Sequence, residues 1–259
     1  MSIFKQVNLR HRLEVPMHLG WRDLRSRYAQ TKIGPWWSAS SLFIIVIGIS
    51  LSTGLLTGNE ALQQAPKIAV AMGFWTFVSG VLTEATDTFV TDRSILLNTT
   101  ISDSMMTVRL LWRNYLILLH NSIVIVIFLA LSRSSPVEFF KVVVLMVFFA
   151  PFLCGSMFVP AFLFSRFGAF NRDLRVFLTT AIQLNFFITP ILWDPPASGP
   201  MHFVFLMNPL GWAIQFAKEF VFNPVFPTKL LLVLALITGS FSLVFVVLKQ
   251  NLTSIKKFL

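Results

Sequence analysis

The sequence is poor in cysteine and in charge. It has one cysteine, Cys154, in 259 residues, and charged residues make up only 12% of the chain, with 11 acidic residues among them. A single thiol excludes a disulfide framework or a cysteine-rich metal site within one chain. Because Cys154 lies in an apolar stretch, we expect it to pack against its neighbours.

Familiar catalytic and metal-binding motifs are also missing. No segment fits G-x-x-x-x-G-K-[ST], the loop with which P-loop ATPases hold phosphate. The four histidines are scattered and have no H-E-x-x-H or other metal-ligand spacing. We therefore expect no catalytic residues, no metal site and no bound cofactor in this chain. If it depends on ATP and Mg, a separate subunit must use them.

Long apolar segments dominate what is present. Hydrophobic residues make up 55% of the chain, and about 20 apolar residues suffice for a helix to cross a bilayer. The sequence predicts an all-α polytopic membrane protein with an arm over residues 1–35, followed by a transmembrane domain over 36–259. We predict six transmembrane helices, at 36–57, 68–90, 107–131, 137–165, 175–193 and 228–248.

The positive charge of the chain predicts its orientation. A net charge of +10 would suggest nucleic acid in a soluble protein, but beside long apolar runs it indicates a membrane surface instead. Sixteen lysines and arginines fall in the arm, the tail and alternate loops, against five on the opposite side. By the positive-inside rule both termini are cytoplasmic. The arm is too long and too mixed for a signal peptide, so we expect it to remain attached.

The arm contains an amphipathic pattern. Met17, Trp21, Leu24 and Tyr28 recur at helical spacing and share one face, while the charged residues between them point elsewhere. Such a basic helix lies flat at the headgroup level of a membrane. It is either a simple anchor or an interface helix that also contacts a cytoplasmic partner.

Two acidic residues, Glu84 and Asp87, lie inside the second predicted span. Carboxylates are costly in lipid and usually face a cavity or a partner charge. The simpler interpretation is that this end of the helix reaches water or pairs with Arg93 or Arg113. The alternative is a proton relay or a catalytic pair.

The connection 92–103 carries aliphatic residues among polar ones. We predict a short amphipathic helix with exposed aliphatic side chains that docks into a groove of a soluble partner. An ordinary tight loop is the alternative. The docking candidates are Ser94, Ile95, Leu96, Leu97, Asn98 and Ile101.

Segment 194–227 is apolar but rich in proline. Its two short apolar pieces, 201–207 and 212–222, are each too short to cross a bilayer and meet at Asn208-Pro209-Leu210-Gly211. We predict a re-entrant external helical hairpin between the fifth and sixth spans. It serves either as an external gate, with Asn208, Pro209 and Trp212 as candidates, or as a passive cap.

Aromatic residues make up 14% of the chain. Trp36, Trp37, Trp193 and Trp212 lie where an interfacial belt is expected. Rings that face an aqueous channel could stack on sugars, although rings that face lipid are commoner. The candidates for the channel are Trp36, Trp37, Phe74, Trp75, Phe186 and Phe187.

Four stretches, in order, resemble the membrane subunits of ABC-2 type polysaccharide exporters, in particular the lipopolysaccharide O-antigen branch. They are R-D-L-R-S-R-Y-A-Q-T-K-I-G-P-W-W (22–37), L-L-W-R-N-Y-L-I-L-L-H-N (110–121), S-R-F-G-A-F-N-R-D-L (165–174) with Q-L-N-F-F-I-T-P-I-L-W (183–193), and N-P-L (208–210). The resemblance covers nearly the whole chain. One departure is that many members have a proline in the connection after the second span, and this chain has none from Asp92 to Asp103.

The resemblance implies a half-transporter of the bacterial inner membrane. Two copies of the chain would form a pore, and two separate ATP-binding cassette subunits would bind below it. The cargo would be a polysaccharide on undecaprenyl pyrophosphate, moved from cytoplasm to periplasm. Membrane lipid would be a further partner, and nucleic acid would not. Arg22, Arg25, Arg27 and Tyr28 would receive the lipid headgroup, and the 92–103 connection would couple to the ATPase.

Three rival functions remain. The same architecture could export another cargo, such as teichoic acid, a lipid or a drug. An integral membrane polyprenyl-phosphate enzyme would use Glu84 and Asp87, although such enzymes need several polar groups at one membrane face. An ion-coupled carrier would work without an ATPase.

Overall fold

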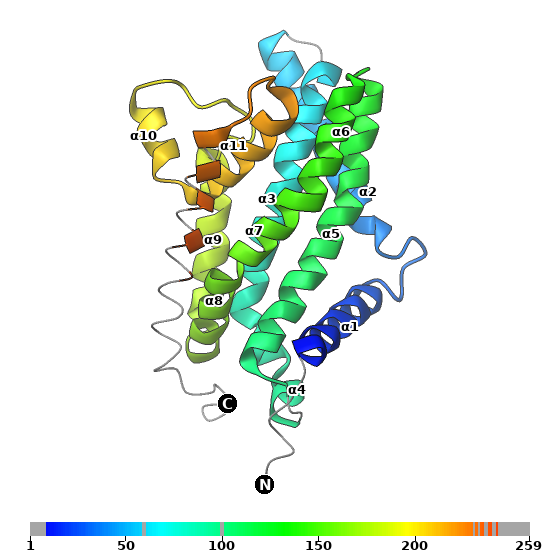
Figure 1. Cartoon of the computed structure of the whole chain (residues 1–259), viewed down its shortest axis with the longest axis vertical. Helices are drawn as coiled ribbons and strands as arrows, with labels where there is room; N and C mark the ends of the chain where they lie inside the picture. Colours follow the sequence, from blue (N-terminus) through cyan, green and yellow to red (C-terminus); the bar gives the residue numbers. More distant parts are fainter. Residues whose placement is uncertain are drawn as a thin grey trace.

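The computed structural model describes residues 9–58, 61–98 and 101–229 and seven positions between 231 and 242. Within these residues all regular structure is helical (Figure 1). The elements are α1 (Leu9–Arg27), α2 (Trp36–Thr57), α3 (Ala61–Thr91), α4 (Arg93–Asn98), α5 (Asp103–Leu131), α6 (Pro136–Val144), the π-helical turn η1 (Leu145–Phe149), α7 (Ala150–Ser156), α8 (Phe158–Phe170), α9 (Asp173–Ile188), α10 (Pro200–Leu206) and α11 (Pro209–Phe222).

Four helical segments are long and apolar enough to cross a membrane. They are Trp36–Leu56, Ala61–Thr91, Asp103–Leu131 and the continuous run Pro136–Phe170, and they correspond to the first four predicted spans. Their ends differ from the prediction by up to seven residues, most at the start of α3.

Neither of the last two predicted spans is confirmed. α9 has only 16 residues and ends at Ile188, so the predicted span 175–193 was too long at its carboxyl end. The cause is Pro190, which lacks an amide hydrogen and disfavours helical geometry in the residue before it. The predicted sixth span, 228–248, lies largely outside the described residues.

α3 is the central helix. It is the most buried of the four long segments and packs against α2, α5, α8 and α11. Its 31 residues span about 46 Å at 1.5 Å each, more than the roughly 30 Å of a hydrocarbon core. The end of α3 that carries Glu84 and Asp87 can therefore extend towards the polar boundary of a bilayer.

The segment from α6 to α8 is one long, irregular helix. Pro151 has no amide hydrogen to donate to the preceding turn. Directly before it the helix widens into η1, in which the Ala150 amide donates to the carbonyl of Leu145, five residues back. The irregularity thus has a local cause in the sequence.

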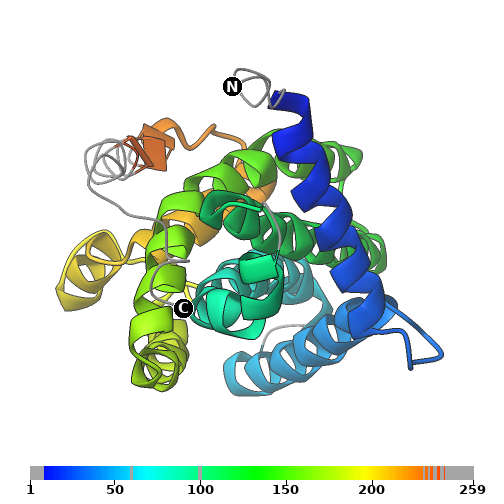
Figure 2. The same ribbon diagram turned by 90° about the horizontal axis from the view of Figure 1, so that it is seen from below.

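α1 lies across the lower end of the bundle, against α5 (Figures 1 and 2). Pro16, Gly20 and Leu24 form its buried face. A Cβ atom on Gly20 would lie 2.9 Å from the backbone oxygen of Arg109, so glycine permits this close approach. The helix was predicted correctly, but two residues predicted to share one face differ in environment: Leu24 is fully buried in the protein, whereas Trp21 is exposed.

α10 and α11 lie at the opposite end from α1 and α4 (Figure 1). Asn208 joins them: its Oδ1 accepts a hydrogen bond from the Gly211 amide at 3.1 Å, and its Nδ2 donates to Thr189 Oγ1 at 2.9 Å. Trp212 stacks on Phe205 with ring centroids 5.2 Å apart. The two predicted apolar pieces are therefore helices, and the buried Asn208 side chain holds their junction to the end of α9.

A buried lysine, Lys218, fastens α11 to the segment that follows α9. Its Nζ donates to the carbonyls of Pro190 at 2.9 Å and Trp193 at 3.0 Å and to Asp194 Oδ1 at 2.8 Å. All three of its hydrogens have partners, so the burial of this cation is compensated. We call these four residues the outer latch.

Acidification should loosen the outer latch. Burial alone would raise the pKa of Asp194, but the hydrogen bond and charge of Lys218 hold that pKa below its ordinary value. The stabilisation is therefore complete above about pH 4, the ordinary aspartate pKa, and is lost as the pH falls through the folded-state pKa. We expect the Tm in detergent to drop in that acidic range and Asp194→Asn to reduce the drop. The effect should be small, because the Asp194 side chain is 69% exposed.

The matched control for this pH profile is Asp173→Asn, which alters an exposed aspartate at the start of α9. Its acid profile should follow that of the unmodified chain. An Asp194→Asn profile that is indistinguishable from both would show that the latch contributes nothing to acid stability.

Candidate functional site: a charged cavity between α1, α3, α5 and α9

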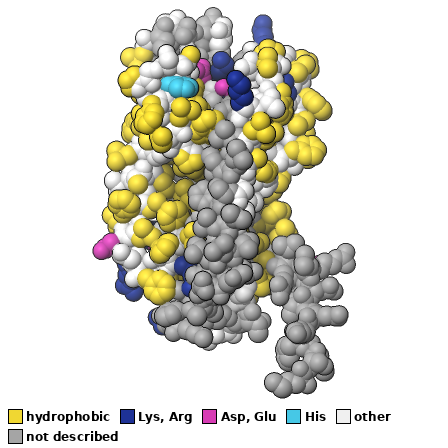
Figure 3. Space-filling model, turned by 60° about the vertical axis from the view of Figure 1, so that its left-hand side comes forward, with side chains coloured by type: hydrophobic (Ala, Val, Ile, Leu, Met, Phe, Trp, Pro, Cys, Tyr) yellow, Lys and Arg dark blue, Asp and Glu magenta, His cyan; other side chains and the backbone are white. Residues whose placement is uncertain are grey.

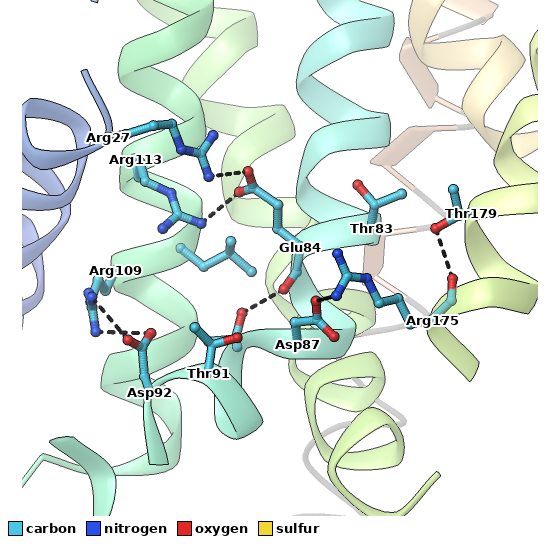
Figure 4. Close-up of a pocket in the computed structure, with 12 residues that line it drawn as sticks. Arg27, Thr83, Glu84, Asp87, Thr91, Asp92, Arg109, Arg113, Arg175 and Thr179 are labelled. Atoms are coloured by element: carbon cyan, nitrogen blue, oxygen red, sulfur yellow. Dashed lines mark hydrogen bonds and ion pairs between the residues drawn. The ribbon is translucent and has the colours of Figure 1, made fainter. Parts of the chain in front are cut away.

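A cavity of about 500 Å³ lies near the α1 end of the bundle (Figure 4). Its charged side chains come from α1, α3, the turn after α3, α5 and α9. The lining residues are Arg27, Thr83, Glu84, Asp87, Thr88, Thr91, Asp92, Arg109, Leu110, Arg113, Arg175 and Thr179.

Glu84 joins three helices at this cavity. Its Oε1 accepts from Arg27 Nη2 of α1 at 2.6 Å, and its Oε2 accepts from Arg113 Nη2 at 2.6 Å and Asn114 Nδ2 at 2.8 Å, both on α5. Figure 4 shows the Arg27 and Arg113 guanidinium groups converging on this one carboxylate. The predicted ion pair with Arg113 is thus confirmed, whereas Arg93 is exposed on α4 and is not a partner of Glu84.

Arg109 forms a second junction beside the first. It is buried and donates to Asp23 of α1 and to Asp92, with 3.1 Å between Arg109 Nη1 and Asp92 Oδ2. Burial raises the pKa of Asp92 more than the nearby Arg109 lowers it. Asp23 also approaches Arg113 at 3.9 Å. These contacts tie α1 to α5 and to the turn after α3.

The wall formed by α9 is held more weakly. Arg175 Nη1 lies 2.5 Å from Asp87 Oδ2, which joins α9 to α3 across the cavity (Figure 4). The Arg175 side chain is 63% exposed, and exposed ion pairs contribute about 1 kcal/mol or less. Ile182 is the only buried residue of α9.

The cavity has more hydrogen-bond donors than acceptors. Four arginines and three carboxylates line it. The Nε of Arg113 is buried and has no hydrogen-bond partner within the described part of the chain. Burial would lower the pKa of Arg27, but the charge of Glu84 raises it above its ordinary value, so this guanidinium stays charged. Arginines suit phosphate because their planar forks donate two parallel hydrogen bonds.

The structure separates the residues that the sequence grouped as a headgroup site. Arg27 lines the cavity, but Arg22 and Arg25 are exposed on the outer face of α1 and Tyr28 is half-buried beside it. Arg109 and Arg175 were missed, and Arg113 was predicted only as a partner of Glu84. Arg109 and Arg113 are four residues apart in a helix opposite two acidic residues, a spacing that could have identified them.

The proposed docking segment is a helix, α4, but its apolar side chains are mostly covered. Leu96 is fully buried in a small cluster with Phe89 and Met106, against which Ile95 and Ile101 pack. Only Leu97 is exposed among the four aliphatic residues, together with the polar residues Ser94 and Asn98. The expectation of four exposed aliphatic residues was therefore wrong.

The candidate channel aromatics do not form one group. Phe74 is fully buried in the core, 5.6 Å from Phe149 by ring centroids, so the prediction that it faces a channel is wrong within this chain. Trp75 is buried edge-on against Phe186. Phe187, Trp36 and Trp37 are exposed.

No protein-family model and no curated protein matches this chain.

Proposed function

We propose that this chain is the membrane-spanning permease subunit of an ATP-driven exporter of lipid-linked polysaccharide, with undecaprenyl pyrophosphate-linked O-antigen as the cargo class. Two copies form the pore in a bacterial inner membrane, with both termini cytoplasmic and two ATP-binding cassette subunits attached. The observation that carries the proposal is the arginine-lined cavity at one end of an apolar helical bundle.

The cavity suits the anionic part of such a cargo. A pyrophosphate needs many donors, and the lining supplies four guanidinium groups, one with an unpartnered buried Nε. Three carboxylates hold these arginines in place until the anion arrives. Because the weakest wall is the α9 side, a lipid-anchored group enters between α3 and α9 when the Asp87–Arg175 pair opens.

The attachment of α1 supports mechanical coupling. α1 and α4 lie at the same end of the molecule (Figure 1), which the proposal assigns to the cytoplasm. α1 is bound to α3 through Arg27–Glu84 and to α5 through Asp23–Arg109. A push on α1 by a closing ATPase dimer therefore reaches the cavity directly, since Arg27 is one of its walls.

The opposite end supports an external cap. α10 and α11 have 7 and 14 residues, too few to span a bilayer. In the proposed topology they dip into the outer leaflet between the fifth and sixth transmembrane helices. Asn208 and the outer latch fix this hairpin to the end of α9, so movement of α9 moves the gate.

The geometry favours transport over the enzyme alternative. Glu84 and Asp87 are both engaged by arginines, through Arg27, Arg113 and Arg175. Both oxygens of Glu84 already accept hydrogen bonds and Asp87 holds Arg175, so neither carboxylate is free to take a proton from a substrate. Instead, arginines paired with carboxylates can release them and bind a phosphate in their place.

The test uses two double variants that remove the same charge. Arg27→Gln/Arg113→Gln removes guanidinium groups from the cavity, and Arg22→Gln/Arg25→Gln removes them from the exposed face of α1. In a strain that lacks its own O-antigen permease and expresses this chain with its ATPase, we expect the first to lower surface polysaccharide about tenfold or more, because each charged hydrogen bond contributes about 1.5–3 kcal/mol. The second should stay near the unmodified level at equal protein abundance.

Two results would contradict the proposal. An equal loss in both variants would place the headgroup on the outer face of α1 and not in the cavity. Cargo translocation by vesicles that contain this chain alone, without an ATPase, would remove the assignment as a subunit of an ATP-driven exporter.

A further inference from the structure

A second polar cavity, of about 410 Å³, lies at the α10–α11 end of the molecule. It is formed by the start of α3, the segment after α9 and one side of α11. Figure 3 shows acidic and basic side chains gathered near this end of the surface, above a broad apolar area. The lining residues are Lys67, Asp194, Pro195, Gln215, Lys218, Glu219, Phe222 and Asn223.

The lining offers both donors and acceptors that have no partner among the described residues. Gln215 is 6% exposed, and its Nε2 donates to Glu219 Oε1 at 2.9 Å. Its Oε1 is buried and has no hydrogen-bond partner within the described residues. Lys67 is exposed and belongs to none of the ion pairs of the described chain. Lys218 already donates all three of its Nζ hydrogens within the outer latch, so it contributes only to the wall of the cavity.

The mixture of lysines and carboxylates in the lining excludes strongly charged ligands. An anion would meet the carboxylates of Asp194 and Glu219, and a cation would meet the ammonium groups of Lys67 and Lys218. The described residues also contain no group of three metal-ligating side chains. Opposite charges in the lining balance, so the cavity suits a neutral ligand.

Among neutral ligands, a sugar fits the lining best. Each sugar hydroxyl both donates and accepts, as the mixed amide, amine and carboxylate groups require. Phe222 and Pro195 add apolar surface for the C–H face of a sugar ring. The volume is that of an ordinary small-molecule site, about 300–1,000 Å³.

We propose that this cavity, which we call the outer sugar site, binds one or two neutral sugar units. Gln215, Glu219 and Lys67 supply hydrogen bonds, Phe222 supplies the stacking face, and the exposed Asn223 lies at the mouth. The site is distinct from the inner cavity, which holds the charged end of the cargo. The identification of its sugar with the exported glycan rests on the proposed function, but binding of sugar does not.

The test measures protection of a cysteine at the mouth of the site. Asn223→Cys is made in a Cys154→Ser background, and the purified full-length chain in detergent reacts with a polar maleimide. The probes are methyl α-mannoside, L-rhamnose and N-acetylglucosamine, each at about 50 mM, well above a millimolar Kd. Lys229→Cys, at an exposed position that does not line the cavity, is the matched control.

At least one sugar should slow labelling at position 223 by about threefold or more and leave position 229 unchanged, as expected for a site that is mostly occupied. Glu219→Ala and, separately, the exposed Lys67→Ala should weaken the protection while the Tm is retained. The proposal is overturned if no sugar protects, or if inorganic phosphate or calcium protects better than any sugar. It is also overturned if both substitutions leave protection intact.

The two proposals can fail separately. Protection is measured on the isolated chain without ATPase or lipid, so a failure of ATP-driven export leaves the sugar result standing. If no sugar protects position 223, the proposal of export still rests on the inner cavity and its arginines.

Discussion

Replacing Glu84 with alanine should loosen α1 from the bundle and lower the stability of the protein. The substitution leaves Arg27, Arg113 and Asn114 without their shared acceptor, and two of these donors are guanidinium groups next to a third, Arg109. Removing one partner of a buried ion pair costs about 3–5 kcal/mol. We expect about 2–3 kcal/mol here, because the Arg27 side chain is 40% exposed.

Hydrogen exchange and thermal unfolding in detergent measure the two consequences. Amides of α1 should exchange faster in Glu84→Ala, and the Tm should fall by about 5–10 °C, as expected for a chain of this size. Glu84→Gln keeps the shape of the side chain and one acceptor oxygen. Its α1 exchange and its Tm should therefore lie between those of Glu84→Ala and those of the unmodified chain. Glu14→Ala, which removes an exposed glutamate of α1 itself, is the control and should change neither quantity. Unchanged α1 exchange in Glu84→Ala would show that this carboxylate does not hold the helix.

The ion pair of Glu84 shows what sequence could and could not provide. A carboxylate within an apolar span needs a partner charge, and Arg113 at the same end of the next span was a sound choice. The second partner, Arg27, could not be found in this way. It is 57 residues away on an arm whose docking direction depends on the surface of α5.

Gly20 explains the error about α1. Periodicity identified an apolar stripe through Trp21, but the face that docks is the adjacent one, where Gly20 lets the backbone reach Arg109. A glycine contributes nothing to a hydrophobic pattern, so the pattern identified only the stripe through Trp21, which is exposed. Leu24, four residues after Gly20, lies on the docking face and is fully buried.

Leu96 illustrates the limit of reading a short segment by itself. The triplet Ile95-Leu96-Leu97 stands between polar residues in the sequence, which suggested exposure. Burial comes from Phe89 and Met106 on the helices that flank the connection. The long apolar helices, by contrast, were predictable because composition over about 20 residues determines them without knowledge of their neighbours.

The contact between α3 and α8 was also not predictable from a local sequence pattern. α8 buries Ala161, Ser165 and Gly168 at helical spacing, so it presents small residues to α3. Small residues let helix backbones approach closely within membranes. Here the approach is so close that a Cβ atom on Gly168 would lie 2.0 Å from the backbone oxygen of Thr86.

Gly168→Ala should therefore separate α8 from α3 and strongly destabilise the protein. Overpacking usually costs about 1–3 kcal/mol, and more when the neighbour cannot move aside. The obstacle is the backbone of the central helix and not a flexible side chain, so we expect about 3 kcal/mol net of the roughly 1 kcal/mol by which alanine favours a helix over glycine. Thermal unfolding in detergent and the yield of monodisperse protein measure the effect.

Two further variants separate this clash from a general intolerance of substitution. Gly155→Ala lies in α7 of the same long segment, where an added Cβ atom meets nothing within 4 Å, and it should leave the Tm unchanged or slightly higher. Thr86→Ala combined with Gly168→Ala should not restore stability, because the atoms in the way belong to the main chain. Rescue by Thr86→Ala would mean that a side chain sets the distance between the two helices, and the close backbone contact of α3 and α8 would then be wrong.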